Sequence, residues 1–350
     1  MKRTSLTVSV FCIVVLILAH SCTKEKPEQT DISNQYNVTT IAGSGVRGHV
    51  DGSATSSQFD RPRDIVVDAQ GNIYVSDFAA YRIRKITKDG MVSTLAGGTR
   101  GTADGNGSSA QFIAPGALAV DAQDNIYVAD STRIRKITPS GNVTSVTGAL
   151  VPANPGTTIP GASSNYLEGI ALDKQGNIYA VINFFLKFQI CKISPTGDVS
   201  TFIDSTQNFP TTGYLSTLHN IAIDASGNIF ASRNVFLGYE IYKITQSKTV
   251  TLLASTPDVH GIAVNSSTGE IFFSGSAIDC NSFTSCQSLY RVYKLTSAGK
   301  YMLLAGRDPG FADGPGDVAR FNVAAGISAD AQGNLYLADQ ENNRIRKISK

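Results

Sequence analysis

The sequence predicts an all-β fold: a six-bladed β-propeller with four antiparallel strands per blade. Two observations carry this prediction. One strand motif recurs six times along the chain, and the last copy lacks a strand that the N-terminal region supplies. The chain has 350 residues, of which 42% are hydrophobic and 17% charged, so it can bury a sizeable core.

The recurring motif is a short apolar run, an Asp or Asn, a tight turn and a second apolar run. It reads IVVDAQGNIY at residues 65–74 and ISADAQGNLY at residues 327–336. The first run is too short for a helix and too continuous for an exposed strand, which predicts a buried inner strand. The acidic or amide side chain of each copy is expected to accept hydrogen bonds from turn amides. These residues are Asp68, Asp121, Asp173, Asp224, Asn265 and Asp330.

The remaining strands follow in each copy. Residues 82–86 (RIRKI) alternate as a third strand, and residues 92–96 (VSTLA) form a fourth after a Gly-containing turn. The sixth copy ends after its third strand, whereas residues 37–43 match the fourth strand of the first copy. We therefore expect the N-terminal strand to pair with the C-terminal blade and close the ring, which removes two free sheet edges.

These motifs resemble the NHL repeat, and the segments between blades are similar to those of the NHL propellers of teneurins. Each such linker contains an Asp-Gly pair and, a few residues later, an aromatic residue: Phe59, Phe112 or Phe321. The resemblance covers residues 37–350 and implies a six-bladed propeller used chiefly for binding. We expect the three Phe side chains to fasten the linkers to the core.

The N-terminus has the features of an export signal. Lys2 and Arg3 precede an apolar run over residues 6–19, and a polar stretch follows Cys22. This resembles a bacterial lipoprotein signal over residues 1–21, with Cys22 as the lipidated N-terminus and residues 22–36 as a polar tether. The alternative is an ordinary secretory signal with a chance cysteine. We expect an exported protein held to a membrane by its lipid, on the periplasmic side or the cell surface.

Charge argues against one class of partner. The chain has 30 Lys and Arg against 28 Asp and Glu. Loss of Lys2 and Arg3 with the signal would leave equal numbers. Because a neutral chain has no built-in attraction for phosphate backbones, nucleic acid is not an expected partner.

Cysteine use is consistent with export. Cys280 and Cys286 lie six residues apart in a polar stretch, and an oxidising compartment would let them form a disulfide. Cys191 lies in a strand pattern and is expected to be a small buried side chain.

Opposite charges recur where the second strand ends and the third begins. Asp77 and Arg82, like Asp130 and Arg133, are separated only by a short loop. We expect each pair to form a structural ion pair at the surface.

One aligned position of the six repeats, which we call a column, carries polar and charged residues that could bind a ligand. Two positions before each apolar run, at the start of the inner strand, stand Arg63, Gly116, Glu168, His219, His260 and Ala325. Glu168, His219 and His260 belong to consecutive blades, and one carboxylate with two imidazoles suits Zn²⁺ or Fe²⁺. The two His match zinc-binding positions of an NHL-type lyase that cleaves peptidyl-hydroxyglycines, whereas Glu168 departs from that pattern. The alternative is a set of solvated channel residues, or His hydrogen-bonded to a neighbouring loop.

Aromatic residues gather in the loops between the second and third strands of two blades. Phe184, Phe185 and Phe188 lie in the third copy, and Phe236 and Tyr239 in the fourth. With Arg63 they are candidates for a ligand or partner patch on the face where the inner strands begin. The alternative is that these rings fold back onto the blade.

The sequence favours binding over catalysis. We expect a binding or scaffolding propeller whose partner is an envelope or extracellular protein, a glycan or a small molecule. The alternative is a metal-dependent lyase or hydrolase built on Glu168, His219 and His260. No other cofactor is expected, and no catalytic residue is assigned, because no nucleophile–base or phosphate-loop pattern rises above chance.

Overall fold

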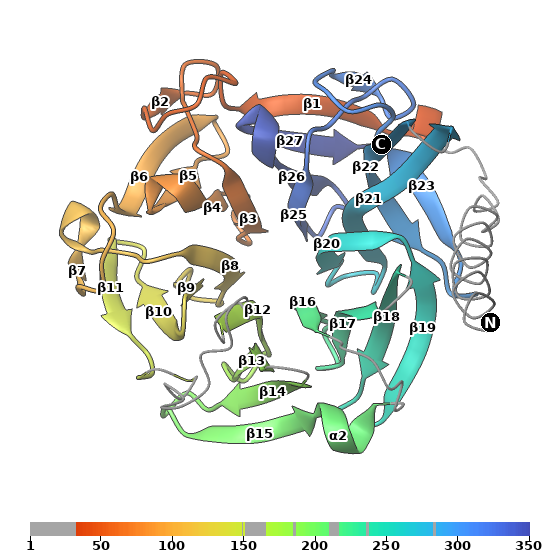
Figure 1. Ribbon diagram of the computed structural model, residues 1–350. Helices are drawn as coiled ribbons and strands as arrows, with labels where there is room; N and C mark the ends of the chain where they lie inside the picture. The colour runs from red at the N-terminus through yellow and green to blue at the C-terminus, as the bar shows by residue number, and fades with distance from the viewer. Residues whose placement is uncertain are drawn as a thin grey trace, which may run out of the picture.

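Six antiparallel sheets surround a central channel, as the blades of a propeller do (Figure 1). This computed structural model describes residues 33–148, 150, 166–184, 187–209, 217–235, 238–282 and 285–350. The first strand of every blade lies next to the channel, and each later strand lies further out. The predicted six-bladed, all-β architecture is confirmed.

Blades 1 and 2 have short strands of similar length. Blade 1 contains β3 (Pro62–Val67), β4 (Ile73–Asp77), β5 (Arg82–Ile86) and β6 (Met91–Gly97). Blade 2 contains β8 (Pro115–Val120), β9 (Ile126–Asp130), β10 (Arg133–Ile137) and β11 (Asn142–Ser145). The linkers add a fifth, two-residue strand to each, β2 (Gly52–Ser53) and β7 (Gly105–Asn106).

Blades 3, 4 and 5 have four strands each, and their second and third strands are longer than those of blades 1 and 2. Blade 3 contains β12 (Tyr166–Leu172), β13 (Ile178–Phe184), β14 (Lys187–Ile193) and β15 (Val199–Asp204), followed by α2 (Ser205–Asn208). Blade 4 contains β16 (Leu218–Ile223), β17 (Ile229–Val235), β18 (Gly238–Ile244) and β19 (Val250–Thr256). Blade 5 contains β20 (Asp258–Val264), β21 (Ile271–Ser282), β22 (Ser285–Leu295) and β23 (Tyr301–Ala305).

Blade 6 closes the ring with the two ends of the chain. It contains β25 (Ala324–Ala329), β26 (Leu335–Asp339), β27 (Arg344–Ser349), β1 (Asn37–Ala42) and β24 (Gly314–Pro315). The N-terminal strand pairs antiparallel with the C-terminal one, with Asn37 opposite Ser349 and Val38 opposite Ile348. The predicted closure is confirmed, and β1 and β27 lie side by side in Figure 1.

The predicted tether boundary is four residues too late. Ser33 to Gln35 form the 3₁₀-helix η1, and the side chains of Ser33 and Tyr36 are buried. The amide of Gly316 donates to the carbonyls of both Ser33 and Tyr36. Residues 33–36 therefore belong to the propeller, because Tyr36 buries its ring against blade 6.

The turns between the first and second strands work as predicted. Asp68 Oδ1 accepts the amides of Gln70 (3.0 Å) and Asn72 (2.7 Å), and its Oδ2 accepts the Asn72 side chain and the Tyr74 hydroxyl. The equivalent side chains of the other blades accept turn amides in the same way. Asp68 and its equivalents in the other blades therefore stabilise turns.

The ion-pair prediction had the wrong arginine and the wrong environment. Asp77 pairs with Arg84, two residues beyond the predicted Arg82, and both side chains are fully buried. Arg135 with Asp130 and Arg346 with Asp339 repeat this arrangement. Arg82 and Arg84 share a strand face, but Arg82 lies directly opposite Asp77 at the end of the strand and reaches the carbonyl of His49, whereas Arg84 lies deeper under the linker.

Buried arginines also hold the linkers. Arg84 donates to the carbonyls of Val50 and Gln58 and to Asp51, and its guanidinium carbon lies 4.9 Å from the Phe59 ring centroid. Phe59, Phe112 and Phe321 are all completely buried, as predicted. Cys191, which is also buried as expected, stands at the position of Arg84 in blade 3.

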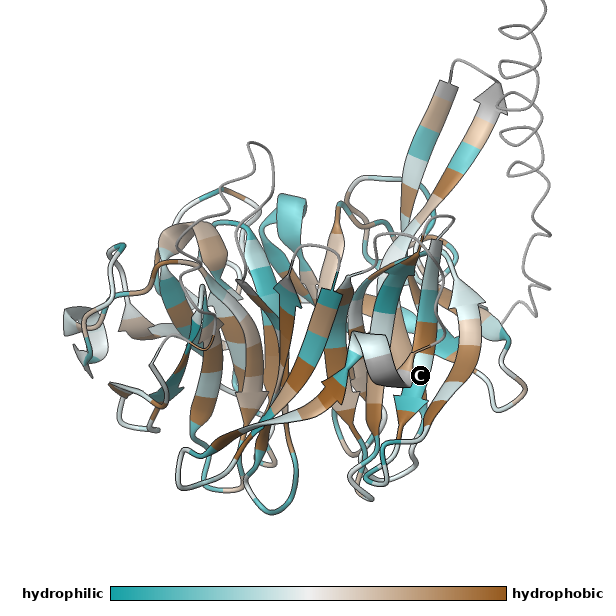
Figure 2. Ribbon diagram, turned by 60° about the horizontal axis from the view of Figure 1, so that its bottom comes forward, coloured by the Kyte–Doolittle hydropathy of each residue, from teal (hydrophilic) through white to brown (hydrophobic). Residues whose placement is uncertain are grey.

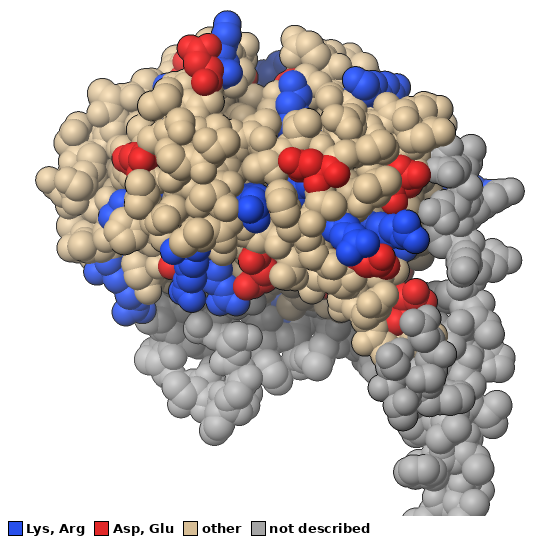
Figure 3. All heavy atoms as spheres, turned by 90° about the horizontal axis from the view of Figure 1, so that it is seen from above, with Lys and Arg blue, Asp and Glu red and all other residues tan. Residues whose placement is uncertain are grey.

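Three further 3₁₀-helices complete the described elements: η2 (Phe78–Ala80), η3 (Gly107–Ser109) and η4 (Gln340–Asn342). Within the described residues, no helix has the length and apolar character needed to cross a membrane. Acidic and basic side chains are interspersed on the face that Figure 3 shows, with no large area of one sign.

Candidate functional site

The polar column predicted at the strand starts lies at one end of the channel. Glu168, His219 and His260 belong to the neighbouring inner strands β12, β16 and β20, and Arg63 belongs to β3. With Tyr239 and Asp258 they form one group, which we call the mouth cluster: Arg63, Glu168, His219, Tyr239, Asp258 and His260. The cluster joins blades that are far apart in sequence.

An ion pair bridges part of the mouth. Arg63 Nη2 lies 3.5 Å from Glu168 Oε2, so a side chain of blade 1 reaches past blade 2 to blade 3. Blade 2 carries Gly116 at this position, and a Cβ built there would approach the Arg63 guanidinium carbon to 4.0 Å. A larger residue at 116 would compete for the space that Arg63 occupies. Arg63 stays 41% exposed, whereas Glu168 is only 11% exposed.

His219 is a neutral imidazole between two blades. Its Nε2 lies 2.9 Å from Thr217 Oγ1, and its Nδ1 lies 3.9 Å from Glu168 Oε1. Burial lowers the pKa of His219, although the negative charge of Glu168 opposes this. The ring therefore carries one proton at pH 7 and can both donate and accept a hydrogen bond.

His260 is a cation held by two acceptors. Its Nε2 lies 3.0 Å from Asp258 Oδ2, and its Nδ1 lies 2.9 Å from the carbonyl oxygen of Ala324. A carboxylate and a carbonyl can only accept, so both ring nitrogens must carry a proton. Although burial disfavours the charged ring, the hydrogen bond and charge of Asp258 raise the pKa of His260.

Aromatic rings flank the two imidazoles. The ring centroid of Tyr239 lies 5.6 Å from that of His219, and that of Tyr290 lies 6.3 Å from that of His260. Burial, together with the charge of Asp258, raises the pKa of Tyr239, so its hydroxyl stays protonated and accepts the side-chain amide of Asn234 at 3.1 Å. Asp258 also accepts the Ser276 hydroxyl at 3.1 Å.

The predicted metal-binding set does not fit a metal ion in this arrangement. Among the residues that the structure describes, no group of three or more His, Cys, Asp or Glu side chains is placed to hold one. His260 has no free nitrogen lone pair, because both nitrogens donate. The alternative considered for the column, polar channel residues hydrogen-bonded to neighbours, describes the observed contacts.

The predicted aromatic patch is divided by the structure. Phe188 is completely buried and packs edge-on against Phe209, with ring centroids 4.9 Å apart, so it is a core residue and not part of a surface patch. Tyr239 joins the mouth cluster. Phe185 and Phe236 lie outside the described residues, as does the side chain of Phe184.

The predicted disulfide is present, whereas the predicted lipid-anchor residue lies outside the part of the chain that the structure describes. Cys280 and Cys286 are bonded and face each other across the hairpin of β21 and β22. Cys22 lies outside the described residues.

The sequence analysis did not identify Asp258 and Ser276 as site residues. Asp258 stands two residues before His260 on the same strand, where side chains share a face.

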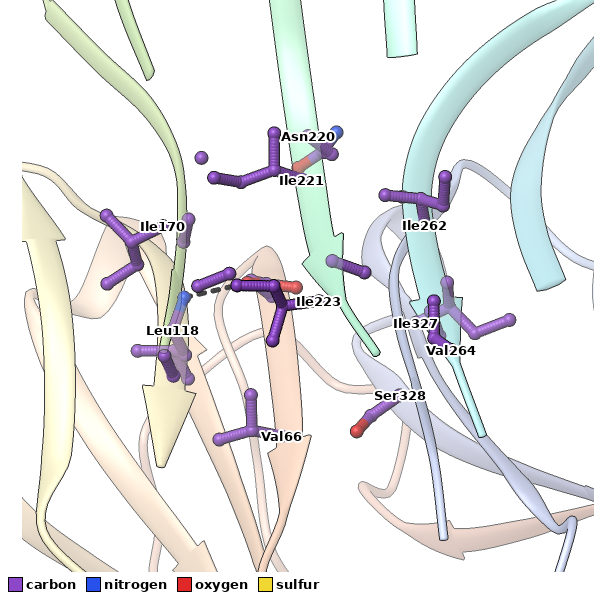
Figure 4. Close-up of a pocket in the computed structure, with 18 of the residues that line it drawn as sticks. Val66, Leu118, Ile170, Asn220, Ile221, Ile223, Ile262, Val264, Ile327 and Ser328 are labelled. Atoms are coloured by element: carbon purple, nitrogen blue, oxygen red, sulfur yellow. Dashed lines mark hydrogen bonds between the residues drawn. The ribbon is translucent and has the colours of Figure 1, made fainter. Parts of the chain in front are cut away.

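Below the mouth cluster, the inner strands line a cavity of about 190 Å³ (Figure 4). Its wall is mainly aliphatic, with Val66, Leu118 and Ile221 among the lining residues. Asp64 also lines it and accepts the amide of Leu118 at 2.8 Å, and burial raises the pKa of Asp64 to about 6. The channel thus changes from a polar mouth to an apolar interior.

Comparisons with known proteins agree with this architecture. Residues 59–86, which include β3, β4 and β5, match the NHL repeat family model. Mouse teneurin-3 is 25% identical, in a match that covers 71% of this chain and 13% of that protein. The chain therefore spans about an eighth of the length of this curated relative.

Solved structures share the fold at low identity. A Bacteroides thetaiotaomicron protein of unknown function has a TM-score of 0.65 and 18% identity, and the match covers 90% of this chain and 76% of that protein's chain. An auxiliary nutrient binding protein from the same organism has a TM-score of 0.60 and 16% identity, with the same coverage. A gluconolactonase from Xanthomonas campestris has a TM-score of 0.58 and 14% identity, and the match covers 92% of this chain and 93% of the gluconolactonase chain. At these identities the likeness concerns the fold.

Proposed function

We propose that this six-bladed propeller of NHL repeats is an exported, lipid-anchored binding protein, and that its mouth cluster holds a small uncharged ligand rich in hydroxyl groups, such as a sugar unit of a glycan. The protein described as an auxiliary nutrient binding protein supports a binding role for such a propeller.

The balance of charge in the mouth cluster carries the proposal. Arg63 is matched by Glu168, His260 is matched by Asp258, and His219 is neutral. An ionic ligand would need an uncompensated opposite charge at the mouth to replace its lost hydration. A hydroxyl group both donates and accepts, so it suits a surface that offers both kinds of group at short spacing.

The shape and composition of the mouth also favour a sugar. The rings of Tyr239 and Tyr290 stand beside hydrogen-bonding groups, and small-molecule sites combine apolar faces with a few fixed polar groups. Hydrogen bonds to Thr217, Asp258 and the carbonyl of Ala324 already hold the two imidazoles, so little ordering of these rings is needed when a ligand binds.

A binding experiment tests this function. The mature protein, without residues 1–21, is applied to an array of neutral, acidic and basic mono- to hexasaccharides, and hits are measured by titration calorimetry. We expect neutral saccharides to bind and Arg63→Ala to weaken binding at least tenfold. Arg307→Ala is the matched control, because Arg307 is an exposed arginine of a linker. Failure of every neutral saccharide to bind, or an equal loss in both variants, would contradict the proposal.

The anchor needs its own test. Cells expressing the full chain are fed an alkyne fatty acid, and we expect Cys22 to become labelled and the protein to enter the detergent phase. Cys22→Ala is expected to abolish both. Secretion of the wild-type protein without label would leave the ordinary export signal as the correct interpretation.

A further inference from the structure

Blade 5 carries a hairpin that extends beyond the other blades. Strands β21 and β22 have 12 and 11 residues, whereas β4 and β5 of blade 1 have five each. Their outer part rises above the disc as a two-stranded arm (Figure 2). We call residues 276–282 and 285–290 the arm.

A disulfide braces this arm where the propeller does not cover it. Ile278, Asp279, Cys280, Cys286, Gln287 and Ser288 are all exposed. A two-stranded hairpin is marginally stable in water on its own, and the Cys280–Cys286 bond joins directly opposite residues. So short a closed loop contributes little to global stability. The bond therefore serves mainly to keep the shape of the arm.

One face of the arm is continuous with the mouth cluster. At its base, Ser276 and Tyr290 are opposite each other; Ser276 donates to Asp258, and Tyr290 lies beside the His260 ring. Alternation of side chains places Ile278 and Ser288, two residues further along each strand, on this same face, followed by the Cys280–Cys286 pair.

This face is uncharged and partly apolar. Asp279 and Gln287 are opposite each other and point to the other side of the hairpin. Ile278 is 75% exposed, more than any other large hydrophobic side chain described. An aliphatic group beside a hydroxyl, at Ser288, matches a pyranose ring, which presents C–H groups on its face and hydroxyls at its edge.

We propose that this face of the arm is a second subsite of the same binding site, and that the ligand is an uncharged glycan of at least two units. One unit lies in the mouth cluster, and the next packs its C–H face on Ile278 while its hydroxyl reaches Ser288. The inference rests on the proposed function. Ile278, Ser288 and the adjoining disulfide offer far less area than a stable protein–protein interface requires, so a short glycan fits better than a second protein.

Chain length is the variable that tests the subsite. Affinities of the wild-type protein are measured by calorimetry for the mono-, di-, tri- and tetrasaccharide of the neutral series that binds on the array. We expect the disaccharide to bind at least tenfold more tightly than the monosaccharide. Ile278→Ser is expected to remove this gain and to leave monosaccharide affinity unchanged.

Two further variants test the opposite face of the arm and its disulfide. Asp279→Ser alters the opposite face of the arm and is expected to leave every affinity unchanged. The Cys280→Ser/Cys286→Ser double variant is expected to weaken binding of the disaccharide and leave that of the monosaccharide unaltered. Its circular dichroism spectrum and melting temperature show whether the propeller is intact.

The outcomes distinguish the two proposals. Equal affinity for the mono- and disaccharide, or an effect of Asp279→Ser as large as that of Ile278→Ser, would overturn the arm subsite and leave the mouth site standing. Failure of all saccharides to bind overturns both. Concentration-dependent dimerisation in sedimentation velocity that Ile278→Ser abolishes, with unchanged affinities, would assign the arm to self-association instead.

Discussion

Arg84 and Asp77 form an ion pair with a separation of 3.0 Å, and neither side chain is exposed to solvent. The same guanidinium donates hydrogen bonds to the carbonyls of Val50 and Gln58 in the linker and lies over the Phe59 ring. Each blade with a Phe-bearing linker repeats this arrangement, which couples strand, linker and core. Blades 1, 2 and 6 are thus joined to their linkers by one buried arginine each.

Arg84→Met is expected to destabilise the protein by about 3–5 kcal/mol, because it leaves the Asp77 carboxylate buried without its cationic partner. Urea or guanidinium unfolding measures this change. Arg307→Met, at an exposed position, should change stability by less than about 0.5 kcal/mol. The double variant Arg84→Met/Asp77→Leu should recover part of the loss; an additive or greater loss would show that the pair is not what couples the two sites.

Asp64→Asn should stabilise the protein at neutral pH. Burial raises the pKa of Asp64 to about 6, so the folded state binds a proton more tightly than the unfolded state does. This contribution is complete below about pH 4 and is lost as the pH rises through 6. We expect the variant to gain about 2–3 kcal/mol at pH 7.5 relative to the wild type. Unfolding at several pH values tests this, and identical pH profiles of both proteins would contradict it.

The two histidines at the mouth should differ in protonation. At pH 7 we expect His260 to show two protonated ring nitrogens and His219 to show one, since only His260 faces an acceptor at each nitrogen. Long-range ¹H–¹⁵N correlation spectra report this directly. A neutral His260 would remove the charge balance on which the proposed function rests.

Zinc should not bind tightly at the mouth cluster. We expect titration with Zn²⁺ to give no stoichiometric heat, and elemental analysis after purification without chelators to give well under one equivalent. His219→Ala/His260→Ala is the control for any weak signal. One equivalent of metal that this double variant loses would restore the metal-dependent lyase or hydrolase as a candidate.

The positions of the mouth residues were predictable, and their contacts were not. Repeat alignment alone puts Arg63, Glu168, His219 and His260 in one column, and strand alternation could also have pointed to Asp258. The hydrogen bond of His260 to the carbonyl of Ala324 depends on the distance between blades 5 and 6. No local pattern encodes that distance, so the metal hypothesis was chemically reasonable and geometrically unsupported.

The repeat by itself determined the number of blades, the ring closure by residues 37–42 and the acceptor role of the Asp68 column. The blade number and the closure follow from the periodic strand pattern and the strand missing from the sixth copy, and the acceptor role follows from hydrogen bonding between near neighbours in sequence. Only the tertiary structure decided that Arg84 and not Arg82 meets Asp77, that Phe188 is buried and that His260 is a cation. Each of these depends on which part of a strand another blade or linker covers, because burial and through-space contacts set the charge and exposure of a side chain.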